Sequence, residues 1–325
     1  MTDSIISAET GVVARIGELV SAEVGKAVKG QQAVIEGLLI CLLAEGHALL
    51  EGVPGTAKTL MARALATTLQ CEFHRVQFTP DLMPSDIIGT TVYDMKTAEF
   101  FVKKGPIFTS ILMADEINRT PPKTQAALLQ AMEEHRVSID GVDHALPFPF
   151  FVIATQNPIE QEGTYPLPEA QLDRFLMKLK VDYPTPEEET DMLRMYREGF
   201  DPHQLALTGV RPVVDAEMLA RASAEMKAVT VEDGVLKYLV ELIAATRSAP
   251  QVMLGGSPRA AVALLRCSRA LAALEERTFI TPDDVKTVAR PVLRHRLILR
   301  PEAEIEGFTT DQCVENVLTA VPVPR

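Results

Sequence analysis

A chain of 325 residues, 47% of them hydrophobic and with a formal net charge of −12, is long enough for about two domains with substantial cores. The acidic balance argues against a protein that binds the phosphate backbone of nucleic acids over a broad surface. The cysteines share no Cys-x-x-Cys spacing, and we interpret them as reduced residues of a cytoplasmic protein: Cys41, Cys71, Cys267 and Cys313.

The beginning of the chain predicts two helices. Its opening stretch, MTDSIISAET, lacks the basic start and apolar centre of a signal peptide. Apolar residues then recur at helical spacing from Glu9 to Lys29, and a second apolar helix is expected from Gln31 to Glu45, after a turn at Gly30. The longest apolar run, 38–44, is too short to cross a membrane, so we expect no membrane insertion.

The stretch from Ala48 to Thr59, ALLEGVPGTAKT, predicts a buried strand, a glycine-rich loop and the start of a helix. It has the spacing G-x-x-x-x-G-K-[ST], except that Ala57 replaces the second glycine. Because alanine disfavours a positive φ, we expect an ordinary dihedral angle there. Such a loop directs backbone N–H groups at one point near the positive end of a helix dipole, which suits a phosphate. Lys58 would reach the β- and γ-phosphates, and the Thr59 hydroxyl would hold Mg²⁺.

A strand is expected from Glu72 to Phe78, and a hairpin from Thr90 to Gly105. The polar tip of that hairpin suits either a contact with a partner or pore, or a plain surface hairpin. The next apolar run, 110–116, is SILMADE, a buried strand ending in two carboxylates. Asp115 could belong to the Mg²⁺ shell, and Glu116 could orient or deprotonate a water that attacks the γ-phosphate.

A second hairpin is expected over 137–148, turning at Asp140 and Gly141. The apolar strand 150–155 follows and leads to Asn157, whose amide could position the attacking water or could simply begin a turn before proline. A short helix end (169–175) and a strand (176–181) complete an α/β domain with a mostly parallel sheet. The loop with Lys58, the two carboxylates and Asn157 all fall at strand C-terminal ends, where open α/β sheets bind ligands.

A domain boundary is expected at Pro184, giving a nucleotide-binding domain over 1–184 and a helical domain over 185–325. Helical patterns cover 187–198, 215–229, 232–247, 258–276 and 282–294, with caps at Thr185, Ser257 and Thr281. Arg259 lies in the first turn of one helix, where the dipole is unfavourable for a cation. It is therefore either solvated or facing an anion. The acidic segment 301–325 is expected to pack only partly.

These motifs resemble those of the MoxR family of AAA+ ATPases, which is related to the magnesium-chelatase ATPase subunits. The resemblance covers nearly the whole chain and rests on GVPGTAKT, ILMADEINR, ATQNP, EAQLDRF and GGSPRA, in that order. Ala57 itself is typical of MoxR proteins. The resemblance implies a P-loop AAA+ domain with two hairpin inserts, an all-α lid, the ligands ATP or ADP with Mg²⁺, and a ring, most simply a hexamer.

The resemblance also implies roles for individual residues. Val28, Gly30 and Gln31 would line an adenine pocket. The phosphate loop would comprise Gly52, Val53, Pro54, Gly55, Thr56, Ala57, Lys58, Thr59 and Leu60. Thr59 and Asp115 would hold the metal, and Glu116 and Asn157 would act on the attacking water. Arg174 would enter a neighbouring subunit's site as an arginine finger, and Arg259 would bring the lid onto the γ-phosphate.

Several functions remain open at this point. We favour an ATPase that remodels a protein client, which the resemblance extends to clients with von Willebrand factor A (VWA) domains. The alternatives are a nucleic-acid motor, a nucleotide-dependent switch with little hydrolysis, and a metal-chelatase subunit. The acidic first domain and the few lysines of the 90–105 hairpin argue against nucleic acid.

Overall fold

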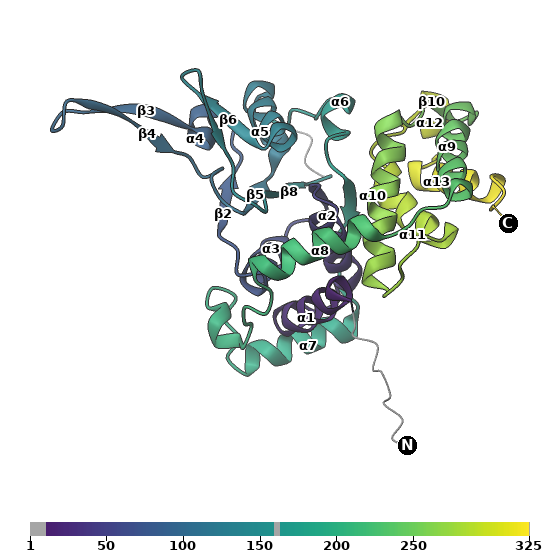
Figure 1. The fold of residues 1–325 in the computed structure, drawn as a ribbon, viewed down its shortest axis with the longest axis horizontal. Helices are drawn as coiled ribbons and strands as arrows, with labels where there is room; N and C mark the ends of the chain where they lie inside the picture. The colour runs from purple at the N-terminus through teal and green to yellow at the C-terminus, as the bar shows by residue number, and fades with distance from the viewer. Residues whose placement is uncertain (1–10, 159–162, 325) are drawn as a thin grey trace.

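A parallel sheet of five strands lies at the centre of the fold, and Figure 1 labels three of them, β2, β5 and β8. The strand order is β2-β5-β8-β1-β9. The computed structural model describes residues 11–158 and 163–324, so the interpretation of residues 1–10 lies outside the described residues. The strands are β1 (Ala48–Glu51), β2 (Phe73–Gln77), β5 (Ile111–Asp115), β8 (Phe151–Gln156) and β9 (Met177–Lys180). Because all are parallel, their carboxyl ends share one edge, which gathers the predicted site residues there.

Both faces of this sheet are covered, which explains why its strands are nearly continuous apolar runs. One face, with Leu50, Met113 and Ile153, packs on α2 (Gln32–Leu43) and α3 (Lys58–Thr68), and α1 (Val12–Ala27) packs against both helices. The other face, with Leu49, Leu112 and Val152, packs on α5 (Pro122–Glu134). Three short helices complete this part: α4 (Pro84–Ile88), η1 (Ile117–Arg119) and α6 (Glu169–Leu172). The α/β prediction is confirmed.

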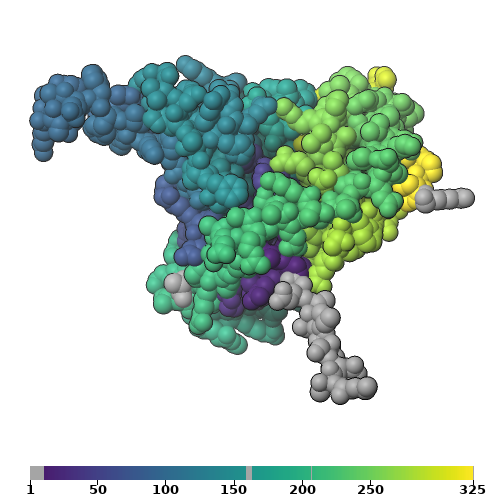
Figure 2. Space-filling model, viewed as in Figure 1, coloured from purple at the N-terminus to yellow at the C-terminus, as the bar shows by residue number. Residues whose placement is uncertain are grey.

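Both predicted hairpins are present. The first pairs β3 (Gly89–Asp94) with β4 (Glu99–Lys104), and the second pairs β6 (Arg136–Ile139) with β7 (Val142–Ala145). Asp140 and Gly141 turn the second hairpin with φ values of 49° and 82°, the positive angles that tight hairpin turns require. The first hairpin projects well beyond the rest of the molecule (Figure 2). Its end carries exposed apolar side chains, with Met95 88% and Phe100 74% accessible.

The second half of the chain is helical, as expected. It contains α7 (Pro186–Arg197), η2 (Leu205–Thr208), α8 (Ala216–Ala228), α9 (Asp233–Ser248), α10 (Pro258–Leu274), α11 (Pro282–Leu293), α12 (Pro301–Ile305) and α13 (Thr310–Ala320). A short pair, β10 (Val252–Leu254) and β11 (Ile298–Leu299), was not predicted. The segment 301–324 packs only partly, in line with the expectation: Cys313, Val314 and Val317 of α13 are buried in the core, whereas most of the other residues are exposed or half-buried.

The helical bundle and the α/β part share one continuous hydrophobic core. α8 packs along α1, whereas α9 to α13 gather on one side of the sheet (Figure 1). The division between residues 184 and 185 therefore stays a prediction. Among the described residues, no helix combines the length and the apolar character that crossing a bilayer requires.

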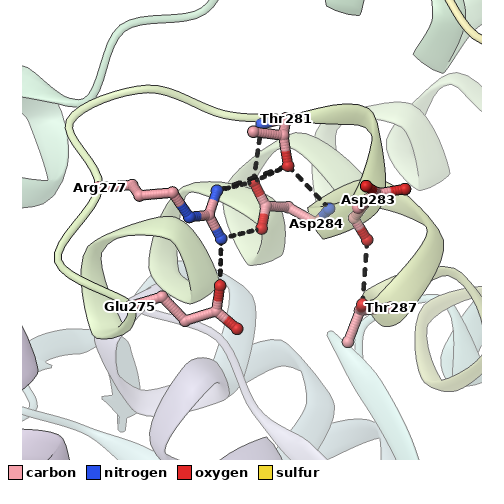
Figure 3. A network of polar contacts seen from close by, with 6 residues as sticks. All are labelled: Glu275, Arg277, Thr281, Asp283, Asp284 and Thr287. Carbon is pink, nitrogen blue, oxygen red and sulfur yellow. Dashed lines mark hydrogen bonds and ion pairs between the residues drawn. The ribbon is translucent and has the colours of Figure 1, made fainter.

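Two of the three predicted helix caps form as expected. Thr185 caps α7 together with Glu188, and Thr281 caps α11 together with Asp284, whose carboxylate also pairs with Arg277 (Figure 3). Asp284 is almost fully buried, so the guanidinium and the cap supply the partners that its charge requires. The third predicted cap, Ser257, occupies the N-cap position of α10 but makes no cap hydrogen bond. Its hydroxyl contacts another segment, described below.

Candidate functional site

The loop between β1 and α3 has the form expected of a phosphate loop, with one difference. Ala57 has φ of 60° and ψ of 19°, so the expectation of an ordinary dihedral there is wrong. The left-handed conformation costs a non-glycine residue about 1–2 kcal/mol, and the small methyl side chain of alanine makes it tolerable. With this conformation, Ala57 turns the backbone directly into α3, where Lys58 is the first helical residue.

The Lys58 ammonium lies inside this loop. Its Nζ donates to the carbonyl oxygens of Gly52 at 2.9 Å and Val53 at 2.6 Å, and to the Thr56 hydroxyl at 3.2 Å. Burial lowers the pKa of Lys58, while the carboxylates of Asp115 and Glu116 act in the opposite direction. The cation therefore faces both the loop and the two acidic residues.

A cavity of about 490 Å³ opens at the carboxyl edge of the sheet and contains this loop. Most of the predicted site residues line it, namely Val28, Gln31, Gly52, Pro54, Gly55, Thr56, Ala57, Lys58, Thr59, Leu60, Asp115, Glu116 and Asn157. Four predicted residues are not part of its lining: Gly30, Val53, Arg174 and Arg259. Segments more than 100 residues apart in the chain thus meet at one cavity.

Thr155, which was not predicted, organises the acidic pair. Its hydroxyl donates to Asp115 Oδ1 at 2.6 Å and accepts a hydrogen bond from the Glu116 backbone N–H at 2.9 Å. Glu116 has a left-handed backbone with φ of 56°, which turns the chain away from β5 at this point. Strand β8 therefore holds the Asp115 carboxylate and the Glu116 backbone through a single side chain.

Strand β2 contributes two further polar residues that sequence reasoning did not identify. Arg75 Nε donates to Asp115 Oδ2 at 3.0 Å, and Gln77 Nε2 donates to Glu116 Oε2 at 2.7 Å. Arg119 also pairs with Glu116, with 3.2 Å between Nε and Oε2. Residues two apart in a strand point to the same face, so Arg75 and Gln77 lie on one face of β2, and this spacing could have identified them.

The other end of the cavity is apolar. Val28 lines it, and the Gln31 amide, also at the cavity, donates to the Asp182 carbonyl at 2.9 Å. Gly30 turns the chain with φ of 71°, and a side chain there would collide with Glu188. Further apolar lining, which sequence reasoning missed, comes from α7 and the segment after it: Met192, Met195, Tyr196, Phe200 and Pro202. The spacing of Met192, Met195 and Tyr196, three and four residues apart on an otherwise charged helix, was the available sequence signal.

Arg174 and Arg259 lie together in a separate cleft, whose lining shares no residue with that cavity. Both contact Glu133 near the end of α5, with 3.2 Å from Arg174 Nη2 to Oε2 and 2.9 Å from Arg259 Nη2 to Oε1. The anion expected beside Arg259 is therefore Glu133. Arg259 lines the cleft with Glu133 and not the cavity with the phosphate loop, so its approach to a γ-phosphate stays a prediction.

The residues at the cavity fit a nucleoside triphosphate with Mg²⁺. The loop and Lys58 offer donors for phosphate oxygens, and the Thr59 hydroxyl and Asp115 carboxylate are the oxygen donors that Mg²⁺ prefers. The apolar end is suited to a planar base, and the volume is within the range of ligand-binding pockets. Fold and site together define a P-loop nucleotide-binding protein with a helical lid.

Comparisons with known proteins agree with this class. The family described as "ATPase family associated with various cellular activities (AAA)" matches residues 47–177, and "AAA lid domain" matches residues 244–317. The chain is 47% identical to "Uncharacterized protein YeaC" of Bacillus subtilis, over 92% of this chain and 94% of that protein. It is 42% identical to "Chaperone MoxR1" of Mycobacterium tuberculosis, over 97% and 85%.

Two more distant comparisons extend this result. "Protein MoxR" of Methylorubrum extorquens is 33% identical over 93% of each chain. The crystal structure of a candidate ATPase from Cytophaga hutchinsonii superposes with a TM-score of 0.88 at 43% identity, covering 96% of each chain. The chain belongs to the MoxR family of AAA ATPases, which confirms the resemblance seen in its motifs.

Proposed function

We propose that the protein hydrolyses ATP in a Mg²⁺-dependent reaction at the cavity beside Lys58. The observation that carries this proposal is that Lys58, Thr59, Asp115, Glu116 and Asn157 all line that cavity. Lys58 neutralises phosphate charge, and Mg²⁺ held through Thr59 and Asp115 adds to that neutralisation. Glu116 orients or deprotonates the attacking water, and Asn157 helps to position it.

Arg174 and Arg259 complete the site of a neighbouring subunit in this proposal. Support comes from their position outside their own chain's cavity and from the exposure of their side chains, 29% and 50%. An arginine supplied by another subunit can raise a phosphoryl-transfer rate by on the order of 10³ or more. Hydrolysis would then depend on assembly into a ring, for which the family resemblance suggests a hexamer.

The work done by hydrolysis would be the remodelling of a client protein in the cytoplasm. The name of the relative "Chaperone MoxR1" supports a chaperone-like role, and the exposed apolar end of the β3–β4 hairpin offers a surface for contact. A client with a VWA domain is suggested by the family resemblance alone.

The first test is ATP turnover per subunit, measured with Mg²⁺ at increasing protein concentration. Shared sites predict that turnover per subunit rises with concentration and then saturates. A rate that stays constant from dilute to concentrated protein would contradict the shared site.

A mixing experiment tests the assignment of Arg174. Arg174→Ala and Lys58→Ala should each abolish turnover, because one lacks the arginine and the other the phosphate lysine. A mixture should regain activity, since some interfaces pair an intact cavity with an intact arginine. Failure of every mixing ratio to recover turnover would rule out action between subunits.

A further inference from the structure

One arginine of the lid, Arg296, is buried against the segment that carries Arg174. Arg296 follows the end of α11 in the chain, and its side chain is only 3% exposed. Its Nε donates to Asp173 Oδ1 at 2.6 Å, and its two terminal nitrogens donate to the carbonyl oxygens of Asp173, Phe175 and Leu176, and to that of Val292. A buried guanidinium with this many partners is a rigid attachment.

The second oxygen of Asp173 reaches a different part of the lid. Asp173 Oδ2 accepts a hydrogen bond from the Ser257 hydroxyl at 3.1 Å. Ser257 occupies the N-cap position of α10 yet makes no cap hydrogen bond there, so its hydroxyl is committed to Asp173. Asp173 thus connects the end of α11 to the start of α10, two residues before Arg259.

The buried His295 reinforces the same attachment. Its Nε2 lies 3.0 Å from the Phe175 carbonyl oxygen, which also accepts from Arg296 at 2.7 Å. The short segment from Asp173 to Leu176 is therefore bound to the lid through its backbone as well as through the Asp173 carboxylate.

These contacts join the segment that carries Arg174 to the start of the helix that carries Arg259. Arg174 follows Asp173 directly, and both Arg174 and Arg259 reach the two oxygens of one carboxylate, that of Glu133. Figure 1 shows α6, which leads to Arg174, between α5 and the start of α10. A pair of guanidinium groups that can share one carboxylate is also spaced to share one phosphate group, which presents several oxygens at similar separation.

We propose that Arg296 is a positioning residue, which with Asp173 and Ser257 holds Arg174 and Arg259 as a preset pair for a single terminal phosphate. The inference rests on the proposed function, in which that phosphate belongs to a neighbouring subunit's nucleotide. Preset donors stabilise charge in the transition state without reorganising during the reaction, so they act on kcat. Glu133 occupies the pair in the isolated chain and must release it when the phosphate binds.

The test compares Arg296→Lys and Ser257→Ala with the wild-type chain. Lysine can pair with Asp173 but cannot also bond the three backbone carbonyls of the 173–176 segment. Ser257→Ala removes one hydroxyl that makes no cap hydrogen bond. We expect kcat to fall by on the order of tenfold for Arg296→Lys and about threefold for Ser257→Ala, with KM and the affinity for a fluorescent ADP changed by less than about twofold.

Arg277→Met is the matched control. Arg277 also pairs with a buried carboxylate of the lid, Asp284, but makes none of these contacts to the Arg174 segment (Figure 3). We expect it to lower the melting temperature while kcat per folded subunit stays unchanged. If Arg277→Met lowers kcat as much as Arg296→Lys does, the effect is general lid destabilisation and the inference fails.

A mixing experiment distinguishes a loss of arginine positioning in Arg296→Lys from a loss of folding. Arg296→Lys subunits retain an intact cavity, so mixing them with Lys58→Ala subunits, which retain intact arginines, should raise turnover above either alone. If mixtures of Arg174→Ala and Lys58→Ala recover turnover but mixtures of Arg296→Lys and Lys58→Ala do not, the inference is overturned. If Arg174→Ala also fails to recover, the shared site of the proposed function has failed, and the inference falls with it.

Discussion

Arg75 and Asp115 form an ion pair across the neighbouring strands β2 and β5, with 3.0 Å between Arg75 Nε and Asp115 Oδ2. The parallel register places Gln77 directly beside Asp115, so Arg75, two residues earlier on the same face, reaches the carboxylate diagonally. The proposed Mg²⁺ site therefore includes a carboxylate that a cation of the protein already holds.

Arg75→Met should lower the Mg²⁺ concentration needed for half-maximal ATP turnover. The exposed pair contributes up to about 1 kcal/mol, so removing the competing cation should shift the half-point by about two- to fivefold. The measurement is a Mg²⁺ titration of turnover at saturating ATP. Arg136→Met, which removes a hairpin arginine paired with Glu134 and Asp143, is the control and should leave the half-point unchanged. An increased Mg²⁺ requirement in Arg75→Met would show that Arg75 supports the site instead.

Glu116→Gln should retain nucleotide binding and lose at least about 100-fold in turnover, as expected when a general base is neutralised. The backbone N–H of Glu116 still reaches Thr155 in this variant, so the loop geometry is preserved. Affinity for a fluorescent ATP analogue and the steady-state turnover together check the prediction. Glu134→Gln changes a carboxylate outside the cavity and should have no effect. Undiminished turnover in Glu116→Gln would remove Glu116 from the mechanism.

Ala57→Gly should leave the free energy of unfolding unchanged or raise it by up to about 1 kcal/mol. Glycine relieves the left-handed strain at φ of 60°, although it also gives the unfolded chain more freedom. The same substitution at the exposed Ala220, inside α8, should cost about 0.5–1 kcal/mol because its backbone is helical. Urea denaturation of the two variants provides the comparison. Equal destabilisation by both would contradict the backbone assigned to Ala57.

His47 should make stability fall in mild acid. Val152 N–H donates to Nδ1 at 3.0 Å, so the imidazole proton is on Nε2, which lies 3.1 Å from the Met132 carbonyl oxygen. Burial lowers the pKa of His47 to about 4. Because the folded pKa lies below the unfolded value of about 6.5, the stabilisation is complete above pH 6.5 and is lost as the pH falls toward 4.

The predicted loss from His47 alone is about 2 kcal/mol between pH 7 and pH 5. His47→Gln should be less stable at pH 7 but should show a shallower decline, by about that amount, in urea denaturation across this range. His203→Gln removes an exposed histidine and should retain the wild-type slope. Identical slopes in the wild type and His47→Gln would show that His47 does not titrate in this window.

Local patterns were sufficient for the strands of the central sheet, both hairpins, the phosphate loop and the acidic pair. Each of these depends on residues close in the chain, such as the apolar run before Asp115 or the Asp140–Gly141 turn. The position of Arg259 was not predictable in this way. It depends on how α10 packs against the α6 segment, and on the contact of Arg296 with Asp173, which is 123 residues away.

Two other differences between the sequence predictions and the structure also arise from contacts between distant parts of the chain or from the closure of a loop. Much of the apolar end of the cavity comes from α7, and the spacing of Met192 and Tyr196 on that helix does not reveal that they face Val28, which is more than 150 residues earlier in the chain. The left-handed angle at Ala57 opposes the intrinsic preference of alanine, and the closure of the loop onto α3 overrides that preference.

The separation of the Lys58 cavity from the Arg174–Arg259 pair gives each subunit a polarity. If one subunit's pair completes the next subunit's cavity, the contact is head to tail, and copies cannot pair by a twofold axis through that surface. An open head-to-tail assembly then always has one cavity without a neighbouring arginine pair at one end, and one Arg174–Arg259 pair without a neighbouring cavity at the other. Closure removes both ends at once, so the last subunit to join contributes two productive contacts where every earlier addition contributed one.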